Sequence, residues 1–580
     1  MRVRVQELHW RSDFEARSLR AVRPRGISFV RGACGVVRSG AKSGGHCEAN
    51  MKTTTSKLWT RRQLIKNGAA AVVGAAAGTA LVLLADGLRA EASAPVRSSA
   101  TASGATVQFP RPAPLDDPRL TFVVTTEASP WQKGATYNPT FQWDLLNLNV
   151  TPGVYPARPA GASQAMAGFG GCFNERGWTA LTALSEADRE SVLHELFDPA
   201  AGARFSYCRT PIGANDFATE AYSYDETDGD FELAHFSIDH DRPTLIPFIH
   251  AAQRYQPNLM LWASPWSPPS WMKRNHFYAE AKAYPGMKEN GIRPDQIGNE
   301  GEDMFIQEPR YFEAYARYFG RYIDAYRSEN IHVGMVMPQN EFNSAQNFPS
   351  CTWTPEGLSR FLHSLGPEMQ KRGVDVFFGT LERGDPKMLE TVMADKTAAS
   401  FIKGVGTQWA GKNALPAIHR EFPSLAIYQS EQECGDGTNT WSYSGYCWQL
   451  MKHYFRSGAS AYLYWNIATD RGGMSTWGWA QNSLVSVDTD AQTYHYNPDY
   501  YLLKHLTHFV DVGAQFVEVT GTCDDALGFV NPDGTIVLLV RNELPHAQLV
   551  QVAVRDRAFA IELSPDSIGT ISIKPTPPIS

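Results

Sequence analysis

Residues 332–342, HVGMVMPQNEF, pass from an apolar, β-prone run directly into polar residues. A near-continuous hydrophobic run of this length is typical of a parallel strand that is covered on both faces. Runs of the same kind recur along the middle of the chain, which therefore holds eight candidate parallel strands. The other seven read AMAGFGG (165–171), RFSYCRTPIG (204–213), NLMLWASPW (258–266), DVFFGTL (375–381), GVGTQWA (404–410), LAIYQSE (425–431) and AYLYWNIA (461–468).

Helical patterns separate these runs. Residues 309–326 carry apolar side chains at a spacing of three to four, which is the stripe of an amphipathic helix. In residues 354–373, Thr354 suits an N-cap, Pro355 suits the first turn, and Gly373 suits a stop. Eight strands that alternate with helices predict an α/β fold, the (β/α)8 TIM barrel.

A doubly wound open sheet is the rival architecture. It requires a glycine-rich phosphate turn with the spacing G-x-G-x-x-G after the first strand. The corresponding segment, GFGGCFNERGW (168–178), lacks that spacing. The barrel is therefore the favoured fold.

The segments on either side of the predicted barrel have a different hydrophobic pattern from the barrel strands. From about residue 505 the sequence alternates apolar and polar residues, with NPDG (531–534) as a hairpin turn, and RLTFVVTT (119–126) has the same character. We expect a small all-β sandwich built from both ends. The expected domains are N-terminal strands of the side domain at 119–165, the catalytic barrel at 166–504 and the rest of the sandwich at 505–580.

The N-terminal segment resembles an export signal. Residues 51–92 hold Arg61 and Arg62 in TRRQLIK, then an Ala/Gly-rich apolar run and the small-residue sequence AEA. This pattern predicts twin-arginine export to the periplasm or the outside of the cell, since so much Ala and Gly is weakly hydrophobic for a permanent anchor. Residues 1–50 are expected to be a non-native leader, and residues 93–118 a linker.

Charge and cysteine usage exclude several classes of partner. Residues 1–92 contain 16 basic and 6 acidic side chains, so the remainder carries a net charge of about −17 and would repel phosphates. Nucleic acid is therefore not an expected partner. Six scattered cysteines follow residue 92 without a repeated C-x-x-C, so no zinc or other metal is expected. An oxidising compartment permits disulfides among them, and the sequence leaves the pairs open.

Polar and aromatic residues gather where the predicted strands end. In a TIM barrel the functional residues lie at the carboxyl ends of the strands. Indoles that stack on sugar rings, together with carboxylates and amides that bond hydroxyls, indicate carbohydrate chemistry. The candidates are Arg209 and Asp216 (second strand), Trp266 (third), Asn340 and Glu341 (fourth), Trp409 (sixth), Glu431 (seventh), and Trp465 and Asn466 (eighth).

Glu341 and Glu431 are the predicted catalytic pair. Cleavage of a glycosidic bond needs one carboxylic acid for the leaving oxygen and a second carboxylate across the anomeric carbon. The fourth and seventh strands face each other across a barrel mouth, and Arg209 is expected to keep Glu431 ionised with a low pKa. Glu433 is expected to have a structural role, since it lies two residues further on.

Each of these residues also has an ordinary structural interpretation. A single glutamate at a strand end is usually a solvated loop residue or a helix cap, and a tryptophan is as often part of a core as a sugar platform. Arg209 could form a plain buried salt bridge. The placement of two glutamates on opposed strands favours the catalytic interpretation.

Seven motifs in order strongly resemble glycoside hydrolase family 30, the family of the lysosomal acid β-glucosidases (glucosylceramidases). The resemblance covers residues 119–575 and implies that Glu341 is the acid/base and Glu431 the nucleophile, without a metal or cofactor. It also implies that Asn482 and five of the candidates above (Arg209, Asp216, Trp266, Asn340 and Trp465) line the sugar subsite, with Asn340 bonding the 2-hydroxyl. The motifs are GFGGCFNERGW (168–178), CRTPIGANDFATEAYSYDE (208–226), LWASPWSPPSWMK (261–273), MPQNEF (337–342), GTQWAGK (406–412), SEQECGDG (430–437) and YLYWN (462–466).

Two departures from the family pattern affect the expected substrate. Ala410 follows Trp409 where the lysosomal enzyme has a tyrosine, and the loop from Arg274 to Glu308 has no match. The expected function is an exported, retaining β-glycosidase acting on β-glucosides, glucosylceramidase-like, with a carbohydrate or glycolipid substrate and no obligate protein partner. The alternatives are an endo-β-1,6-glucanase or xylanase of the same family, and a non-catalytic carbohydrate-binding module.

Overall fold

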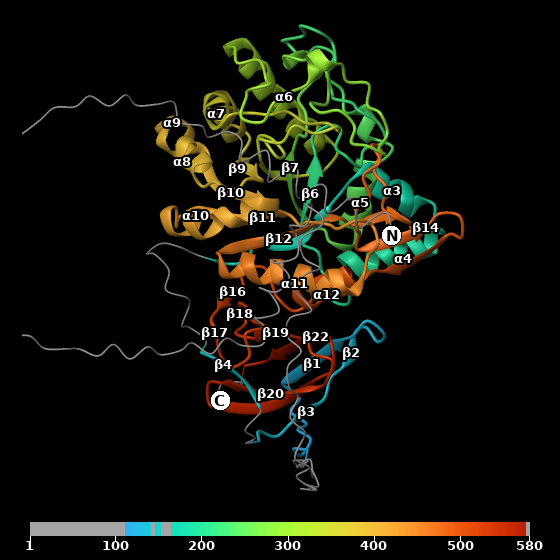
Figure 1. Ribbon diagram of the computed structural model, residues 1–580, viewed down its shortest axis with the longest axis vertical. Helices are drawn as coiled ribbons and strands as arrows, with labels where there is room; N and C mark the ends of the chain where they lie inside the picture. The colour runs from blue at the N-terminus through green and yellow to red at the C-terminus, as the bar shows by residue number, and fades with distance from the viewer. Residues whose placement is uncertain (1–110, 141–144, 152–163, 576–580) are drawn as a thin grey trace, which may run out of the picture. The chain divides into compact units, whose positions relative to one another are not determined.

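The computed structural model describes residues 111–140, 145–151 and 164–575 (Figure 1). The expected leader and export signal, residues 1–92, lie outside the described residues, as does the predicted linker up to residue 110. Within the described ranges, no helix combines the length and the apolar character that a membrane crossing requires.

Eight parallel strands close into a barrel, so the predicted (β/α)8 fold is confirmed. Each of the eight apolar runs of the sequence contributes one strand. In chain order these are β5 (Gly168–Cys172), β6 (Tyr207–Pro211), β7 (Met260–Ser264), β8 (Val333–Val336), β9 (Asp375–Leu381), β10 (Ile402–Gln408), β11 (Ala426–Glu431) and β12 (Ala459–Asn466).

Helices connect successive strands and lie around the barrel (Figure 1). Thr354 caps the helix that was predicted to begin there, since its Oγ1 accepts a hydrogen bond of 2.9 Å from the backbone N–H of Gly357. The helices are α3 (Glu175–Thr182), α4 (Glu186–Phe197), α5 (Leu245–Tyr255), α6 (Pro309–Ser328), α7 (Pro355–Gln370), α8 (Lys387–Ala394), α9 (Lys396–Phe401), α10 (Leu415–Glu421), α11 (Trp441–Arg456) and α12 (Pro498–Thr507). Short 3₁₀ turns span η2 (Asp239–Asp241), η3 (Ser270–Met272), η4 (Pro294–Gln296) and η5 (Trp409–Ala414).

The alternation of side chains along the strands decides which residues point into the barrel. Successive residues of a strand point to opposite faces. Tyr207 and Leu463 belong to a buried cluster of barrel residues, whereas Tyr464 points outward and donates its hydroxyl to Asp499 of α12. Two residues after Tyr207 along β6, Arg209 therefore shares its inward direction.

Segments before and after the barrel in the sequence form the predicted side domain, two β-sheets that share one hydrophobic core. Its first sheet has the order β16-β18-β19-β22-β1-β2 and its second the order β17-β4-β20-β21-β3. The strands from the N-terminal side are β1 (Leu120–Thr125), β2 (Gln132–Lys133), β3 (Thr136–Tyr137) and β4 (Leu146–Val150). Those from the C-terminal side are β16 (Gln515–Val517), β17 (Val519–Gly521), β18 (Ala526–Val530), β19 (Ile536–Asn542), β20 (Gln548–Val554), β21 (Arg557–Leu563) and β22 (Ser567–Ile573).

Some elements had no counterpart in the sequence-based prediction. Strand β21 completes the second sheet, and a separate sheet of β13 (Ala468–Asp470), β14 (Val485–Asp488) and β15 (Thr493–Tyr496) follows the barrel. These strands are short or carry many polar and small residues. Their hydrophobic signal is correspondingly weak.

Candidate active site

Arg209 is the centre of a buried polar site at the carboxyl ends of the barrel strands. Its side chain is fully buried. Nη1 donates a 2.5 Å hydrogen bond to Oε2 of Glu431, and Nη2 donates to Oδ1 of Asn340 at 2.7 Å and to Oγ of Ser264 at 2.8 Å. Hydrogen bonds between a guanidinium and a carboxylate are among the strongest in proteins. One arginine thus joins residues from β6, β7, β11 and the loop after β8.

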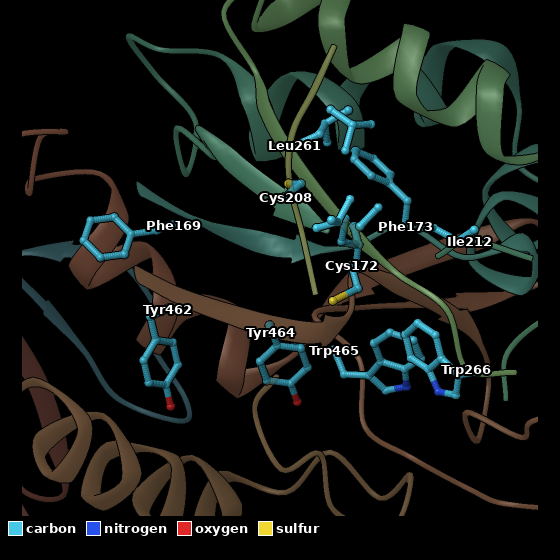
Figure 2. Packing of buried hydrophobic residues seen from close by; sticks show 14 of the residues in the cluster. Phe169, Cys172, Phe173, Cys208, Ile212, Leu261, Trp266, Tyr462, Tyr464 and Trp465 are labelled. Atoms are coloured by element: carbon cyan, nitrogen blue, oxygen red, sulfur yellow. The ribbon is translucent and has the colours of Figure 1, made fainter. Parts of the chain in front are cut away.

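Three indoles surround this guanidinium. Its central carbon lies 4.2 Å from the ring centroid of Trp266, 4.7 Å from that of Trp262 and 5.6 Å from that of Trp465. Figure 2 shows the rings of Trp266 and Trp465 side by side, while Tyr464 points away from them. The centroids of the two indole rings are 5.2 Å apart. The negative faces of indoles favour a cation, so the rings hold Arg209 in place and wall the site.

Glu341 is held by residues of two neighbouring strands. Its backbone has φ = 45°, in the left-handed region that residues with a Cβ seldom adopt. Its N–H donates to Oγ1 of Thr380 in β9 at 2.8 Å, and its Oε1 accepts from Nε2 of Gln408 in β10 at 3.1 Å. The strained turn and these two contacts fix the direction of the carboxylate.

Asn340 is oriented by the donors around its oxygen. Its Oδ1 accepts hydrogen bonds from Arg209, from Thr380 at 3.3 Å and from Gln408 at 3.4 Å. Gln408 is itself oriented, because its Oε1 accepts from Oγ of Ser430 at 3.0 Å. The Nδ2 group of Asn340 is therefore the part of the side chain that is left to donate to a ligand.

A local irregularity in β11 decides the direction of Glu431. Thr407 pairs with Gln429, but the next residue of β10, Gln408, pairs with Glu431, so one residue of β11 is skipped. Such bulges re-aim side chains and are common beside active sites. Here the bulge allows Glu431, the last residue of β11, to reach Arg209.

Glu433 lies outside this network and has structural partners. Its Oε1 forms a 2.5 Å ion pair with Nζ of Lys412, and its Oε2 accepts from the hydroxyl of Tyr446 at 2.6 Å. It therefore anchors the loop after β11 to η5 and α11, in agreement with the role expected from its position in the sequence.

Burial dominates the acidity of both candidate carboxyls. Loss of water raises the pKa of Glu431 to about 7, although Arg209 opposes the rise and the nearby Glu341 adds to it. Burial also raises the pKa of Glu341, against the hydrogen bond from Gln408. The prediction that Arg209 keeps the pKa of Glu431 low is therefore wrong, because the arginine offsets only part of the desolvation.

Asp216 and Trp409 lie in the same region as the two glutamates. Asp216 is buried, and desolvation together with the charges of Glu431 and Glu341 raises its pKa well above the ordinary value. Trp409 is half-buried with φ = 47°, and its side chain hydrogen-bonds Glu341, which lowers the pKa of that carboxyl. Both residues thus belong to the electrostatic surroundings of the pair.

Asn466 and Asn482 differ from the expectation that they line the site. Both are fully buried. The oxygen of Asn466 accepts from Asn174 at 3.0 Å and its nitrogen donates to Oε1 of Gln481 at 3.3 Å, so both ends of the amide bond within the protein. Asn482 accepts from the backbone of Gly437 at 3.0 Å and holds the loop after β11. We assign these two residues to positioning loops.

Sequence reasoning missed several residues of the site. Gln408, Thr380 and Ser264 bind the predicted residues directly, as described above. Ser264 and Gln408 are the last residues of β7 and β10, so the strand-end position that marked the other candidates could have found them. Glu382 also carried a signal, since it directly follows the fifth strand. It accepts from the backbone N–H of Asn343 at 3.0 Å in the turn after Glu341, and burial raises its pKa to about 7.

The structure shows no sign of a metal site or of disulfides in the part of the chain that it describes. No group of three or more histidine, cysteine or acidic side chains there is arranged to hold a metal ion. The six cysteines that follow residue 92 all lie there as buried free thiols, and we find none of the pairs that the sequence left open.

Comparison with known proteins matches nearly all of the described chain. The profile of the glycosyl hydrolase family 30 TIM-barrel domain matches residues 166–510, and that of the family's β-sandwich domain matches residues 513–571. The lysosomal acid glucosylceramidase of Mus musculus is 26% identical over 440 residues, which cover 70% of this chain and 81% of that protein. The endo-1,6-β-D-glucanase neg1 of Aspergillus fumigatus is 25% identical over 422 residues, which cover 68% of this chain and 82% of that protein. Among solved structures, SrfJ from Salmonella typhimurium matches with a TM-score of 0.68 and 22% identity, covering 79% of this chain and all of that one.

Proposed function

The chain belongs to glycosyl hydrolase family 30, and from this premise we propose that it is a retaining β-glucosidase of the glucosylceramidase type. The observation that supports the proposal most directly is the Arg209 bridge. It ties Glu431 to Asn340, the neighbour of Glu341, inside a barrel mouth walled by indoles.

Glu431 acts as the nucleophile in this proposal. Its carboxylate attacks the anomeric carbon, and the bond to the leaving oxygen breaks as a glycosyl-enzyme ester forms. The ion pair with Arg209 favours the ionised form that the attack requires. The positive charge also fixes one carboxylate oxygen, which leaves the other to react.

Glu341 acts as the general acid and then as the general base. It gives its proton to the leaving oxygen, and it later takes a proton from the water that hydrolyses the ester. Burial keeps this carboxyl protonated at a higher pH than an exposed glutamate. Contacts with Gln408 and Thr380 hold it in a fixed direction through both steps.

The remaining polar groups bind the sugar. The free Nδ2 of Asn340 donates to the 2-hydroxyl, where a hydrogen bond strengthens in the transition state. Burial raises the pKa of Asp216 and so favours its protonated form, which can both donate to and accept from other hydroxyls. Trp266 and Trp465 provide apolar faces beside the sugar ring.

The preferred substrate class is a β-glucoside with a lipid aglycone, since the mouse relative is named a glucosylceramidase. The second candidate is an endo-acting β-1,6-glucanase, which the fungal relative supports at nearly the same identity. The two candidate enzymes use the same hydrolytic chemistry and differ in the leaving group that they bind.

Product analysis tests this proposal. Purified protein is incubated with glucosylceramide, β-1,6-glucan, xylan and an aryl β-glucoside, and the first product is followed by NMR. We expect glucose released from the aryl glucoside and from glucosylceramide, and released initially as the β-anomer. Release of the α-anomer would contradict the retaining mechanism, and larger fragments from β-1,6-glucan would favour the second candidate.

The pH dependence follows from the raised pKa values. Activity requires Glu431 ionised and Glu341 protonated, so kcat/KM falls as pH drops through the pKa of Glu431 and falls again as pH rises through that of Glu341. Because burial raises the pKa of Glu431 to about 7, we expect the acidic limb to lie clearly above 4.5, the ordinary value for a glutamate. Initial rates on an aryl β-glucoside between pH 4 and 9 measure the position of the acidic limb. Full activity at pH 4.5 would contradict the assignment of this limb to Glu431.

A further inference from the structure

The turn that carries Glu341 rests on the carboxyl end of β9. The N–H of Glu341 donates to Oγ1 of Thr380, near the end of that strand. Just after the strand, Oε1 of Glu382 accepts from the N–H of Asn343 at 3.0 Å, and Nη2 of Arg383 donates to the backbone oxygen of Asn343 at 3.1 Å. Three side chains from one strand end therefore hold the backbone at Glu341 and two residues beyond it.

The loop from Arg274 to Glu308, which has no match in the family motifs, holds the same turn from the other side. The N–H of Gly301 donates to Oδ1 of Asn343 at 2.6 Å. One residue earlier in the loop, Oε1 of Glu300 accepts from Nη2 of Arg383 at 2.8 Å. Arg383 therefore joins the loop to the turn, because the same nitrogen bonds to both.

Arg383 is a mostly buried cation among three carboxylates, those of Glu300, Glu382 and Glu341. Its side chain is 17% exposed, against 46% for the side chain of Glu300. Nη1 lies 3.6 Å from Oε1 of the buried Glu382. Burial lowers the pKa of Arg383, but the negative charges of the three carboxylates raise it overall. The guanidinium therefore stays charged beside the proposed acid/base residue.

Charged groups from several parts of the barrel act on Glu341. Burial raises its pKa, and the charges of Arg383 and Arg209 are among the effects that lower it. Arg209 pairs closely with the buried Glu431, whereas Arg383 pairs with an exposed loop residue, Glu300. A change in the loop can therefore alter the field that Arg383 exerts. The titratable groups around Glu341 are Arg209 on β6, Asp216 in the loop after β6, Glu382 and Arg383 after β9, and Glu431 on β11.

A general acid needs such a cation when its site is buried. An acid catalyst works best when its pKa lies near the working pH. A carboxyl on which burial alone acts holds its proton too tightly to give it to the leaving oxygen. A nearby cation opposes this effect, because it stabilises the carboxylate that remains after the proton has moved. Arg383 is placed to do so, and Glu300 offsets part of its charge.

We propose that Arg383 is a positioning residue of the acid/base step. It holds the turn of Glu341, and its ion pair with Glu300 lets the unmatched loop set how readily Glu341 gives up its proton. The inference rests on the proposed function, in which Glu341 is the general acid. It adds that the strength of this acid depends on a loop that the family motifs do not define.

Arg383→Gln tests the proposal through the alkaline limb of the pH profile. Glutamine removes the charge and keeps an amide that can donate to the oxygen of Asn343. The substrate is phenyl β-glucoside, whose leaving oxygen needs a proton. We expect the alkaline limb of kcat/KM to move to higher pH by at least about 0.5 unit, because the carboxylate of Glu341 loses a stabilising cation. Arg383→Lys keeps the charge and should return the limb close to its wild-type position.

Glu300→Gln should shift the same limb in the opposite direction. It removes a negative charge that offsets Arg383, from an exposed side chain whose loss puts the fold at little risk. We expect the limb to move to lower pH, by a smaller amount because solvent and salt screen an exposed charge. Disorder of the loop alone would not reverse the sign between the two variants. The matched control is Arg360→Gln, which removes an arginine of α7 that pairs with Asp303 of the same loop at 3.1 Å and should leave the limb in place.

A dinitrophenyl glucoside separates this inference from the proposed function. Its first step needs no proton, so the alkaline limb of kcat/KM should be absent for this substrate in the wild type. The same limb with both glucosides would contradict the acid role of Glu341, and the inference would fall with the proposed function. A limb confined to phenyl β-glucoside that stays in place in Arg383→Gln and Glu300→Gln, or moves in the same direction in both, would overturn the inference alone. An equal shift in Arg383→Lys and Arg383→Gln would do the same, because the charge would then not be the cause.

Discussion

Replacement of Glu431 by glutamine should lower the turnover of an activated aryl β-glucoside by about 10⁴-fold or more, since the covalent step loses its nucleophile. Glutamine has nearly the same shape, and its oxygen can still accept the hydrogen bond from Arg209. The amide cannot form the glycosyl ester. An activated leaving group makes the test specific, because such a substrate needs little help from the general acid.

Glu433→Gln is the matched control for this variant. It makes the same chemical change two residues further along, at a side chain that pairs with Lys412 and Tyr446. We expect it to keep most of its activity. Circular dichroism and thermal unfolding of both variants separate a catalytic loss from a folding defect, because Glu431→Gln also removes the countercharge of a buried arginine.

Mass spectrometry identifies the nucleophile independently of rates. A 2-deoxy-2-fluoroglucoside should label the wild-type chain once, on the peptide that contains Glu431, and should not label Glu431→Gln. Near-normal turnover by Glu431→Gln, or a label on another carboxylate, would contradict the assignment.

The fold was predictable because its signals are local. Each barrel strand is a continuous apolar run such as DVFFGTL, which matches β9 at both ends, and closure into a barrel follows from the count of strands and helices. Strand β21 escaped prediction because RAFAIEL carries charged residues at its first and sixth positions and alanines at its second and fourth, so its alternation is weak.

The meeting of Arg209 with Glu431 and Asn340 was predictable for a similar reason. Residues at the carboxyl ends of barrel strands must meet, whatever loops separate them in the sequence. The structure places Glu431 and Asn340 on the two nitrogens of one guanidinium.

The finer features of the site depend on non-local detail. Gln408 reaches Glu341 from another strand, and a bulge aims Glu431, and neither follows from spacing. The pKa of Glu431 depends on the balance of burial against one ion pair, which a sequence does not quantify. The role of Asn466 also depends on distant residues, because its amide forms hydrogen bonds with Asn174 and Gln481 from other loops.

Replacement of Glu341 by alanine should have an effect that depends on the leaving group. For a substrate with a poor leaving group, such as an alkyl or sugar alcohol, we expect kcat/KM to fall about 10³-fold, within the range that general acid catalysis contributes. For a dinitrophenyl glucoside the first step needs no proton, so the ester on Glu431 forms and accumulates. Its hydrolysis then limits turnover, because no base activates water.

Azide distinguishes loss of the acid/base from general damage to the site. Removal of the Glu341 side chain leaves room beside the anomeric carbon, and azide is a nucleophile that needs no general base. Azide should therefore accelerate turnover of the dinitrophenyl glucoside by Glu341→Ala and yield β-glucosyl azide, with no acceleration in the wild type. The matched control is Glu382→Ala, which removes a buried carboxylate behind the turn of Glu341 and leaves Glu341 itself in place. Azide should not rescue this control, since its acid/base remains. A failure of azide to rescue Glu341→Ala, or the isolation of the α-azide, would show that another residue carries the proton.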